Sequence, residues 1–265
     1  QSALYHQECN VYIHTKLVIE ALLEQDDFHK LSSEQKEMMF LTALFHDIAK
    51  PVTRIEEDGF IKNPHHSRIG AMMSREILYD MGYPAFLREQ LCNIISVHQD
   101  PFWIIEKDDK TIDYLTIKMS LITGSIKNLC LQARADMIGR ICPDQDSTLL
   151  NIDLFEEHAK SMGCWDKPFE FANLHTKRQY LIDYKNKSPY LELYDPTEFT
   201  VNIMCGLPGS GKSTYAKTLG LPIISMDDIR EELHISPTDD QGIIRQEFLK
   251  RTKQMLAKKQ DFIID

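Results

Sequence analysis

An imidazole and a carboxylate stand side by side near the end of an otherwise apolar helical segment. Residues 41–51 read Leu-Thr-Ala-Leu-Phe-His-Asp-Ile-Ala-Lys-Pro, so His46 and Asp47 lie where a helix would stop at Pro51. Removing such a pair from water is costly unless the side chains gain a partner. A metal ion suits a mixed imidazole and carboxylate set. The segment is therefore predicted to carry a metal site.

Further polar residues interrupt apolar helical faces elsewhere in the first 140 residues. His14, His98 and Asp136 each continue an apolar stripe at steps of three or four residues. His66 opens a helix that follows a proline, and the adjacent His65 is an alternative for the same role. Any one of these alone is explained by a hydrogen-bonded core side chain or a helix cap. Five separated sites with the same pattern instead indicate one shared metal centre.

Length and composition are those of a globular protein with two domains. The chain has 265 residues, of which 43% are hydrophobic. No run approaches the ~20 apolar residues of a membrane span and no secretion signal is present, so we expect a cytoplasmic protein without a membrane partner. The six cysteines show no C-x-x-C spacing, which favours reduced thiols. The net charge of −10 argues against a long nucleic-acid groove but is compatible with binding a chain end or a small nucleotide.

Hydrophobic periodicity predicts an all-α helical bundle over residues 1–185. We expect helices near residues 11–24, 32–50, 65–79, 84–98 and 147–163, an apolar stretch over 114–141, a turn at 56–59 and a loop at 100–113. Arg134 and Arg140 flank Asp136 and would either meet substrate phosphate or be solvated. His6 and Glu8 would either line the pocket or lie in a surface turn. The polar, proline-containing residues 186–198 are predicted to link this bundle to a second domain over 199–265.

The second domain begins with a predicted strand, residues 199–205, that runs into a phosphate-binding loop. Residues 206–214 read Gly-Leu-Pro-Gly-Ser-Gly-Lys-Ser-Thr, which satisfies G-x-x-x-x-G-K-[ST] in the required strand-then-helix setting. In such a loop backbone N–H groups wrap the phosphates, Lys212 reaches their charge and Ser213 offers its hydroxyl to Mg²⁺. We therefore predict that ATP and Mg²⁺ bind at Gly206, Gly209, Ser210, Gly211, Lys212, Ser213 and Thr214.

A carboxylate and an arginine follow the next predicted strand, residues 222–225. Asp227 is placed to take a proton from an attacking hydroxyl, and Arg230, one helical turn further, to clamp phosphate. A helix N-terminus that favours acidic residues would explain Asp227 but not the arginine. Lys212, Asp227 and Arg230 are thus the predicted catalytic residues of an α/β P-loop kinase domain with a parallel sheet.

The residues of the first domain resemble the HD-domain phosphohydrolases, including their two-metal members. The likeness covers about residues 5–145 and includes the context His-Ser-Arg-Ile-Gly-Ala from His66. It implies that one ion is held by His14, His46, Asp47 and Asp136 and a second by His66 and His98, with Asp47 bridging. Mn, Fe, Co, Ni or Zn suits these ligands better than Ca. Such an ion would lower the pKa of bound water from about 15.7 towards ~7. Asp47, which would bridge the two ions, is the predicted catalytic residue of this site.

Nearly the whole chain is similar to the bacterial HD-domain polynucleotide kinases, a family of nucleic-acid end-healing enzymes. The likeness includes Val-Tyr-Ile-His-Thr-Lys, Pro-Thr-Asp-Asp-Gln-Gly and Asp-Phe-Ile-Ile-Asp. It implies a metal-dependent 2',3'-cyclic phosphate phosphodiesterase and phosphatase joined to an ATP-dependent 5'-OH kinase, with RNA or DNA ends as substrates and a functional link to a ligase. In those kinases an aspartate at the place of Asp265 assists the phosphate site.

Two other functions fit the same residues. The first site would hydrolyse free nucleotides, such as a dNTP, an alarmone or a cyclic nucleotide, with the P-loop as a regulatory site. Alternatively, the chain would be a non-enzymatic nucleotide sensor, although a sensor does not require Asp227 with Arg230. Three short strands do not complete a P-loop kinase sheet and no Met begins the chain. We therefore expect residues 1–265 to be a piece of a longer polypeptide, with little kinase activity alone.

Overall fold

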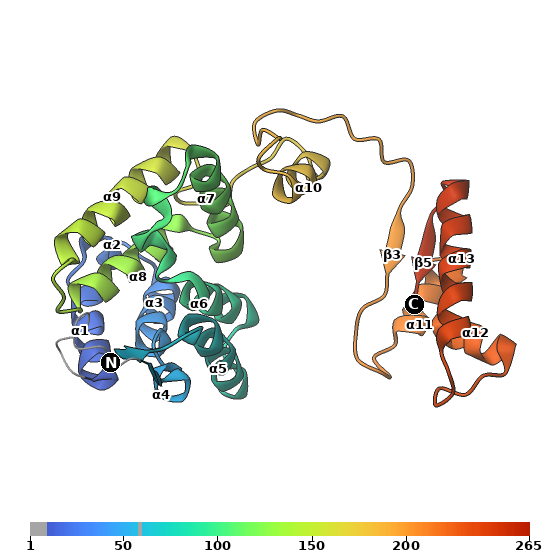
Figure 1. The fold of residues 1–265 in the computed structure, drawn as a ribbon, viewed down its shortest axis with the longest axis horizontal. Helices are drawn as coiled ribbons and strands as arrows, with labels where there is room; N and C mark the ends of the chain where they lie inside the picture. The colour runs from blue at the N-terminus through green and yellow to red at the C-terminus, as the bar shows by residue number, and fades with distance from the viewer. Residues whose placement is uncertain (1–9, 58–59) are drawn as a thin grey trace. The chain divides into compact units, whose positions relative to one another are not determined.

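The chain forms two compact units. A computed structural model describes residues 10–57 and 60–265, and it divides the chain into Gln1–Leu193 and Tyr194–Asp265 (Figure 1). The division falls within the predicted linker, residues 186–198. The predicted fold class is confirmed, because the first unit is helical and the second contains a parallel sheet. His6 and Glu8 lie outside the described residues.

Helices make up most of the first unit, and they bury one continuous apolar core. Its elements, in the part of the chain that the structure describes, are α1 (Val11–Leu23), α2 (Asp26–His29), α3 (Ser33–Phe45), α4 (Lys50–Thr53), β1 (Ile55–Glu57), β2 (Phe60–Lys62), α5 (His66–Asp80), α6 (Ala85–Val97), the 3-10 helices η1 (Asp100–Phe102) and η2 (Ile104–Glu106), α7 (Asp109–Thr123), α8 (Ile126–Ile138), α9 (Gln145–Ser161) and α10 (Leu174–Ile182).

Side-chain caps explain where several of these helices begin. The Asn10 side chain accepts a hydrogen bond from the Ile13 amide at 2.9 Å at the start of α1. Ser32 and Gln35 form the predicted capping box of α3. The apolar stretch over 114–141 is divided between two helices, because Gly124 ends α7 with φ +76° and the Ser125 side chain caps α8. Local chemistry therefore sets the helix that carries Asp136.

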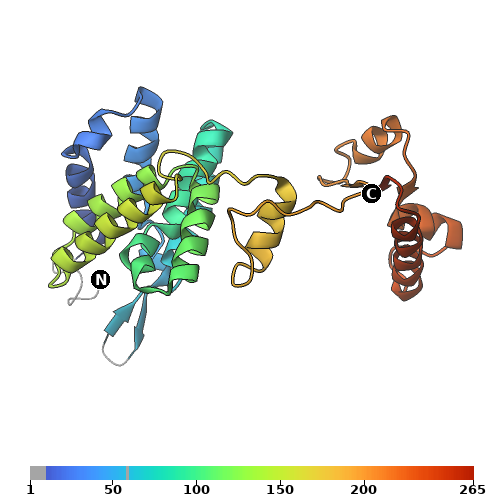
Figure 2. The same cartoon turned by 90° about the horizontal axis from the view of Figure 1, so that it is seen from above.

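Three segments differ from the predictions. The helix expected over 32–50 ends at Phe45, and Pro51 does not stop it but lies in the first turn of the separate helix α4, a position that suits proline. Residues 56 and 57 of the predicted turn belong to strand β1, which pairs antiparallel with β2, with Ile55 opposite Lys62; the two strands extend from the helices in Figure 2. Strands of three residues are too short for their alternation to stand out in a sequence. The predicted loop at 100–113 contains η1, η2 and the first turns of α7, which begins early because Asp108 caps it.

The second unit holds a three-stranded parallel sheet in the order β3-β5-β4. Its elements are β3 (Val201–Ile203), α11 (Lys212–Thr218), β4 (Ile223–Ile224), α12 (Met226–Leu233), α13 (Gly242–Lys258) and β5 (Phe262–Ile264). A small core of Ile224, Ile229, Ile244 and Phe262 joins the sheet to α12 and α13. The P-loop and α12 thus follow the carboxyl ends of β3 and β4, where open parallel sheets bind ligands.

Two further properties bear on the sequence-based expectations. Across residues 10–57 and 60–265, no helix has the length and apolar character needed to cross a membrane. Cys92, Cys130, Cys142, Cys164 and Cys205 are free thiols. Burial raises the pKa of Cys164 to about 11, so this thiol stays protonated at neutral pH.

Candidate metal centre and phosphate-binding loop

Six predicted ligand residues meet in one buried centre of the first unit. They come from five separate places in the fold: His14 from α1, His46 and Asp47 from the end of α3, His66 from the first turn of α5, His98 from the end of α6, and Asp136 from α8. Each is at most 8% exposed. The helix ends matter, because residues there can turn inward without interrupting an apolar helical face.

The structure also separates His66 from its neighbour. His66 is buried, whereas His65 is exposed and takes left-handed backbone angles, with φ +58°. His65 caps α5, so the chain turns sharply there and delivers His66 into the centre. His66, and not His65, faces the other predicted ligands.

Backbone carbonyls orient all four imidazoles in the same way. Each Nδ1 lies within hydrogen-bond distance of a carbonyl oxygen: His14 with Gly139 at 3.3 Å, His46 with Ala43 at 2.7 Å, His66 with Asn63 at 2.9 Å and His98 with Ile95 at 2.7 Å. A carbonyl only accepts, so each Nδ1 is the donor. In the neutral ring, Nε2 then carries a lone pair that is available to a metal.

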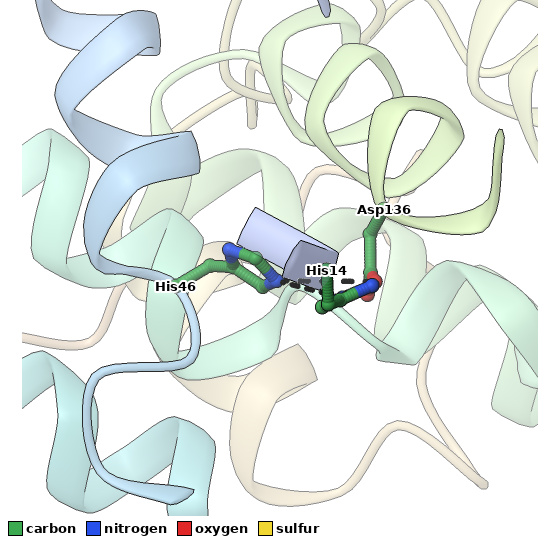
Figure 3. A group of neighbouring side chains, drawn as sticks. All are labelled: His14, His46 and Asp136. Carbon is green, nitrogen blue, oxygen red and sulfur yellow. Dashed lines mark hydrogen bonds and ion pairs between the residues drawn. The ribbon is translucent and has the colours of Figure 1, made fainter. Parts of the chain in front are cut away.

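In the neutral rings those lone pairs face one another, in a space that fits a cation. The Nε2 atoms of His14 and His46 are 3.3 Å apart, and His14, His46 and Asp136 point toward one another in Figure 3. Two acceptors at this distance repel unless a positive charge lies between them. Nε2 of His98 is buried and has no hydrogen-bond partner among the described residues. Burial lowers the pKa of His98 to about 3, so this ring is neutral at physiological pH.

Each carboxylate of the centre is held by a buried cation. Arg140 donates from Nη2 to both oxygens of Asp136, at 2.9 and 3.0 Å, and Lys50 Nζ lies 2.6 Å from Asp47 Oδ2. Burial raises the pKa of both carboxyls. For Asp47 this is outweighed by His46 and Lys50, and for Asp136 by Arg140 and His14, so both pKa values lie well below the usual range. Both carboxyls are therefore anionic at neutral pH.

The donor atoms form two neighbouring groups that fit metal ions. His14, His46 and Asp136 offer atoms within 4.8 Å of one another, and so do Asp47, His66 and His98. Asp47 reaches both groups, because Oδ2 lies 3.3 Å from His46 Nε2 and Oδ1 lies 3.5 Å from His66 Nε2. Imidazole nitrogens with carboxylate oxygens are suitable donors for divalent transition metals. The residues fit one ion in each group, with Asp47 between them.

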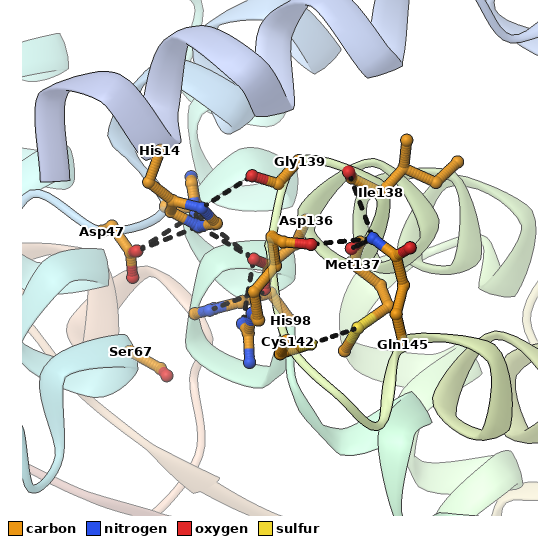
Figure 4. Close-up of polar contacts among 12 residues, drawn as sticks. His14, Asp47, Ser67, His98, Asp136, Met137, Ile138, Gly139, Cys142 and Gln145 are labelled. Atoms are coloured by element: carbon orange, nitrogen blue, oxygen red, sulfur yellow. Dashed lines mark hydrogen bonds and ion pairs between the residues drawn. The ribbon is translucent and has the colours of Figure 1, made fainter. Parts of the chain in front are cut away.

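The end of α8 is fastened where it carries Asp136. Gln145 Nε2 donates to the backbone oxygen of Met137 at 3.0 Å, as Figure 4 shows, and to that of Arg140 at 2.7 Å. Gly139 approaches α1 so closely that an added Cβ would lie 2.6 Å from the Val18 nitrogen. This contact brings the Gly139 carbonyl to His14.

Three contributors to the centre were not predicted from the sequence. Lys50 and the Gly139 carbonyl were missed, and Arg140 was expected to meet substrate or solvent but is buried against Asp136. Arg134 is not a free solvated cation either, because it binds Asp153 and Glu156. A lysine three residues after Asp47 and an arginine four residues after Asp136 are spaced to pair along a helix, and that spacing was the available signal.

The second predicted site lies in a loop that curls around its own lysine. Gly209 and Gly211 adopt φ +76° and +88°, which glycine tolerates without strain. Lys212 Nζ donates to the carbonyls of Gly206 and Leu207, both at 3.0 Å. Ser213 and Thr214 are exposed in the first turn of α11. The loop therefore leaves the start of α11 open to a phosphate group.

The predicted base and clamp are adjacent in α12. Asp227 forms an ion pair with Arg230, whose Nε also donates to Gln241 at 2.9 Å. The side chain of Asp227 is 87% exposed. Asp265 directly follows β5, and its amide donates to the Ile224 carbonyl at the end of β4, at 3.1 Å. Both aspartates thus lie at the carboxyl edge of the sheet, as does the P-loop.

Comparison with known proteins identifies two domain families. Residues 11–127 match the HD domain family, and residues 201–265 match an AAA domain family. An HD domain precedes a P-loop kinase-like domain. HD domains bind divalent metals, and together the two families support hydrolase and kinase-like enzyme activity. Asp136 and Arg140 lie beyond the matched HD segment, so their place in the centre rests on the geometry. The search of curated proteins found no significant match.

Proposed function

We propose that this chain is a bifunctional nucleic-acid end-healing enzyme. The HD domain would hydrolyse a 2',3'-cyclic phosphate at a 3' end, and then the monoester, while the P-loop domain would phosphorylate a 5'-hydroxyl with ATP. The observation that carries this proposal is the pairing, on one chain, of a buried imidazole and carboxylate centre with a P-loop followed by Asp227 and Arg230. If the phosphatase and the kinase acted on the same hydroxyl, they would only consume ATP. Acting on opposite ends of a break, the two activities produce ends that a ligase joins.

The residues of the HD centre would bind and orient two divalent transition-metal ions. His14, His46 and Asp136 would hold one, and His66 and His98 the other, with Asp47 shared. The ions would supply a hydroxide nucleophile near neutral pH and offset charge on the phosphoryl oxygens. A hydrogen bond from each Nδ1 to a backbone carbonyl oxygen leaves Nε2 of the four rings available to a metal ion. Lys50 and Arg140 keep the two carboxylates ionised and in place.

In the P-loop domain, the chain's own residues would position ATP and the attacking hydroxyl. Backbone N–H groups of residues 206–214 would surround the phosphates, with Lys212 at their charge and Ser213 on Mg²⁺. Asp227 is exposed and paired with Arg230, so it is available as the base for a 5'-hydroxyl once Arg230 turns to phosphate. RNA and DNA ends both remain candidate substrates.

One synthetic substrate tests both activities. An RNA with a 5'-hydroxyl and a 2',3'-cyclic phosphate is incubated with Mn²⁺ or Mg²⁺ and γ-labelled ATP, and the two ends are followed by mass spectrometry. We expect the 3' end to be converted to free 2',3'-hydroxyls, and the amount of 5'-phosphate formed measures the kinase activity of the P-loop domain. A parallel panel contains a dNTP, an alarmone, a cyclic nucleotide and a DNA 3'-phosphate. Turnover of free nucleotides together with inert RNA and DNA ends would support the nucleotide hydrolase and refute end healing.

A further inference from the structure

A cavity of about 490 Å³ opens beside the metal centre. This volume lies within the range of small-ligand sites. Its buried lining includes His66, Lys50 and Arg140, of which the last two are paired with Asp47 and Asp136, and Asp144 also lines it. Ile61 from the β1–β2 hairpin and Trp103, whose exposed fraction is 48%, line the same cavity. The cavity thus contains both a candidate metal ligand, His66, and an exposed aromatic ring.

Trp103 is held in place by buried neighbours. It lies between η1 and η2, and its amide donates to the Asp100 carbonyl at 3.1 Å. The preceding Phe102 is 1% exposed, and its carbonyl accepts from Asn151 Nδ2 at 2.9 Å, which fastens this segment to α9. The rings of Phe102 and Trp103 meet edge to face, with centroids 6.4 Å apart. A tryptophan on such a rigid support loses little freedom when a flat ligand covers it.

Packing also connects Trp103 to the metal centre. Arg140, which binds Asp136 at 2.9 Å, places its guanidinium carbon 5.4 Å from the centroid of the Phe102 ring. Phe102 in turn supports Trp103. A chain of packing contacts thus links the exposed ring to the arginine that holds a candidate ligand.

We propose that Trp103 is the stacking platform for the base of the terminal nucleotide, while that nucleotide's phosphate lies beside His66 and the metal centre. This inference rests on the proposed function and names its recognition element. Stacking is open to every base because each has a π-face, and losing one base–aromatic stack costs about 5- to 150-fold in affinity. The site would therefore recognise an end nucleotide without selecting its sequence.

Fluorescence provides a direct binding test, since the chain contains two tryptophans. Trp165 packs under Lys160, outside the residues lining the cavity, so Trp165→Phe makes Trp103 the single reporter. In the metal-loaded Trp165→Phe protein, we expect adenosine 2',3'-cyclic phosphate to quench this emission and inorganic phosphate to leave it unchanged. Absence of quenching in a protein that hydrolyses the nucleotide would overturn the stacking assignment. Quenching by nucleotides in a protein that hydrolyses no end would support stacking while refuting the proposed function.

Kinetics separates stacking from a structural role. For an RNA ending in a 2',3'-cyclic adenylate, Trp103→Ala should raise KM about 10-fold with kcat within about 2-fold, and Trp103→Phe should recover most of the loss. An otherwise identical RNA whose terminal residue is abasic should show the same KM in both variants and the parent. Equal losses on the adenine-ended and abasic RNAs would overturn the proposal. If Trp103→Ala fails to fold, the comparison of Trp103→Phe with the parent and the fluorescence result decide whether Trp103 stacks on the base.

Discussion

Arg134 lies in α8 and Arg140 lies two residues beyond its end, and the two side chains have different partners. Arg140 is buried and binds both oxygens of Asp136, whereas Arg134 binds Asp153 and Glu156 nearer the surface. Lysine keeps the charge but cannot reproduce the planar guanidinium. We predict that Arg140→Lys weakens metal binding by about 10- to 100-fold, the usual effect of losing a residue that orients a ligand. Competition with a fluorescent chelator measures this, and Arg134→Lys is the matched control.

Asp47 differs from the other candidate ligands because its two oxygens face different groups. Oδ2 lies 3.3 Å from His46 and Oδ1 lies 3.5 Å from His66. Asp47→Ala should therefore reduce the occupancy of both ions and lower phosphohydrolase activity by more than about 100-fold, beyond the effect of losing an orienting residue. His98→Ala should lose one ion and retain the other. Elemental analysis of the folded variants tests this, and equal metal loss in the two variants would contradict the bridging role.

At the scale of elements, the close contact of α8 with α1 controls the centre. A Cβ on Gly139 would lie 2.6 Å from the Val18 nitrogen, so Gly139→Ala must push the helices apart. We expect a destabilisation of about 1–3 kcal/mol, together with weaker metal binding because the Gly139 carbonyl orients His14. Gly70→Ala in α5 is the control, since its Cβ would meet atoms no nearer than 3.6 Å. Chemical denaturation compares them, and equal stability of the two variants would refute the packing argument.

Comparison of the predicted with the observed elements shows which parts of the fold the sequence pattern could predict. Helical periodicity identified both ends of α1, α5, α6 and α9 and the start of α3, because amphipathic helices repeat over many positions. The end of α3, at Phe45, falls five residues before the predicted residue 50. Polar residues that break an apolar stripe indicated six residues that the fold brings together. Lys50 was missed although its spacing from Asp47 was an available signal, whereas Gly139 was missed because it contributes a backbone oxygen to a distant segment. The β1–β2 hairpin escaped because its strands are only three residues long.

At the scale of the whole molecule, the two candidate sites lie in separate compact units. Neither set of donor residues includes a side chain from the other unit. Asp47→Ala should therefore abolish phosphohydrolase activity and leave ATP affinity at the P-loop unchanged. Lys212→Ala should weaken ATP binding and leave phosphohydrolase activity unchanged. Titration with a fluorescent ATP analogue and an end-cleavage assay on both variants check this, and loss of hydrolase activity in folded Lys212→Ala would show that the sites are coupled.

The buried HD centre is predicted to hold two metal ions, and both proposed roles of Asp47 depend on this. Anomalous diffraction from crystals of the metal-loaded protein, collected on either side of the metal absorption edge, tests it directly. We predict two peaks about 3.5–4 Å apart, as in two-metal phosphoesterases, one among His14, His46 and Asp136 and one between His66 and His98, with Asp47 reaching both. A single peak would contradict the two-ion arrangement, and no peak within coordination distance of these side chains would contradict the metal centre itself.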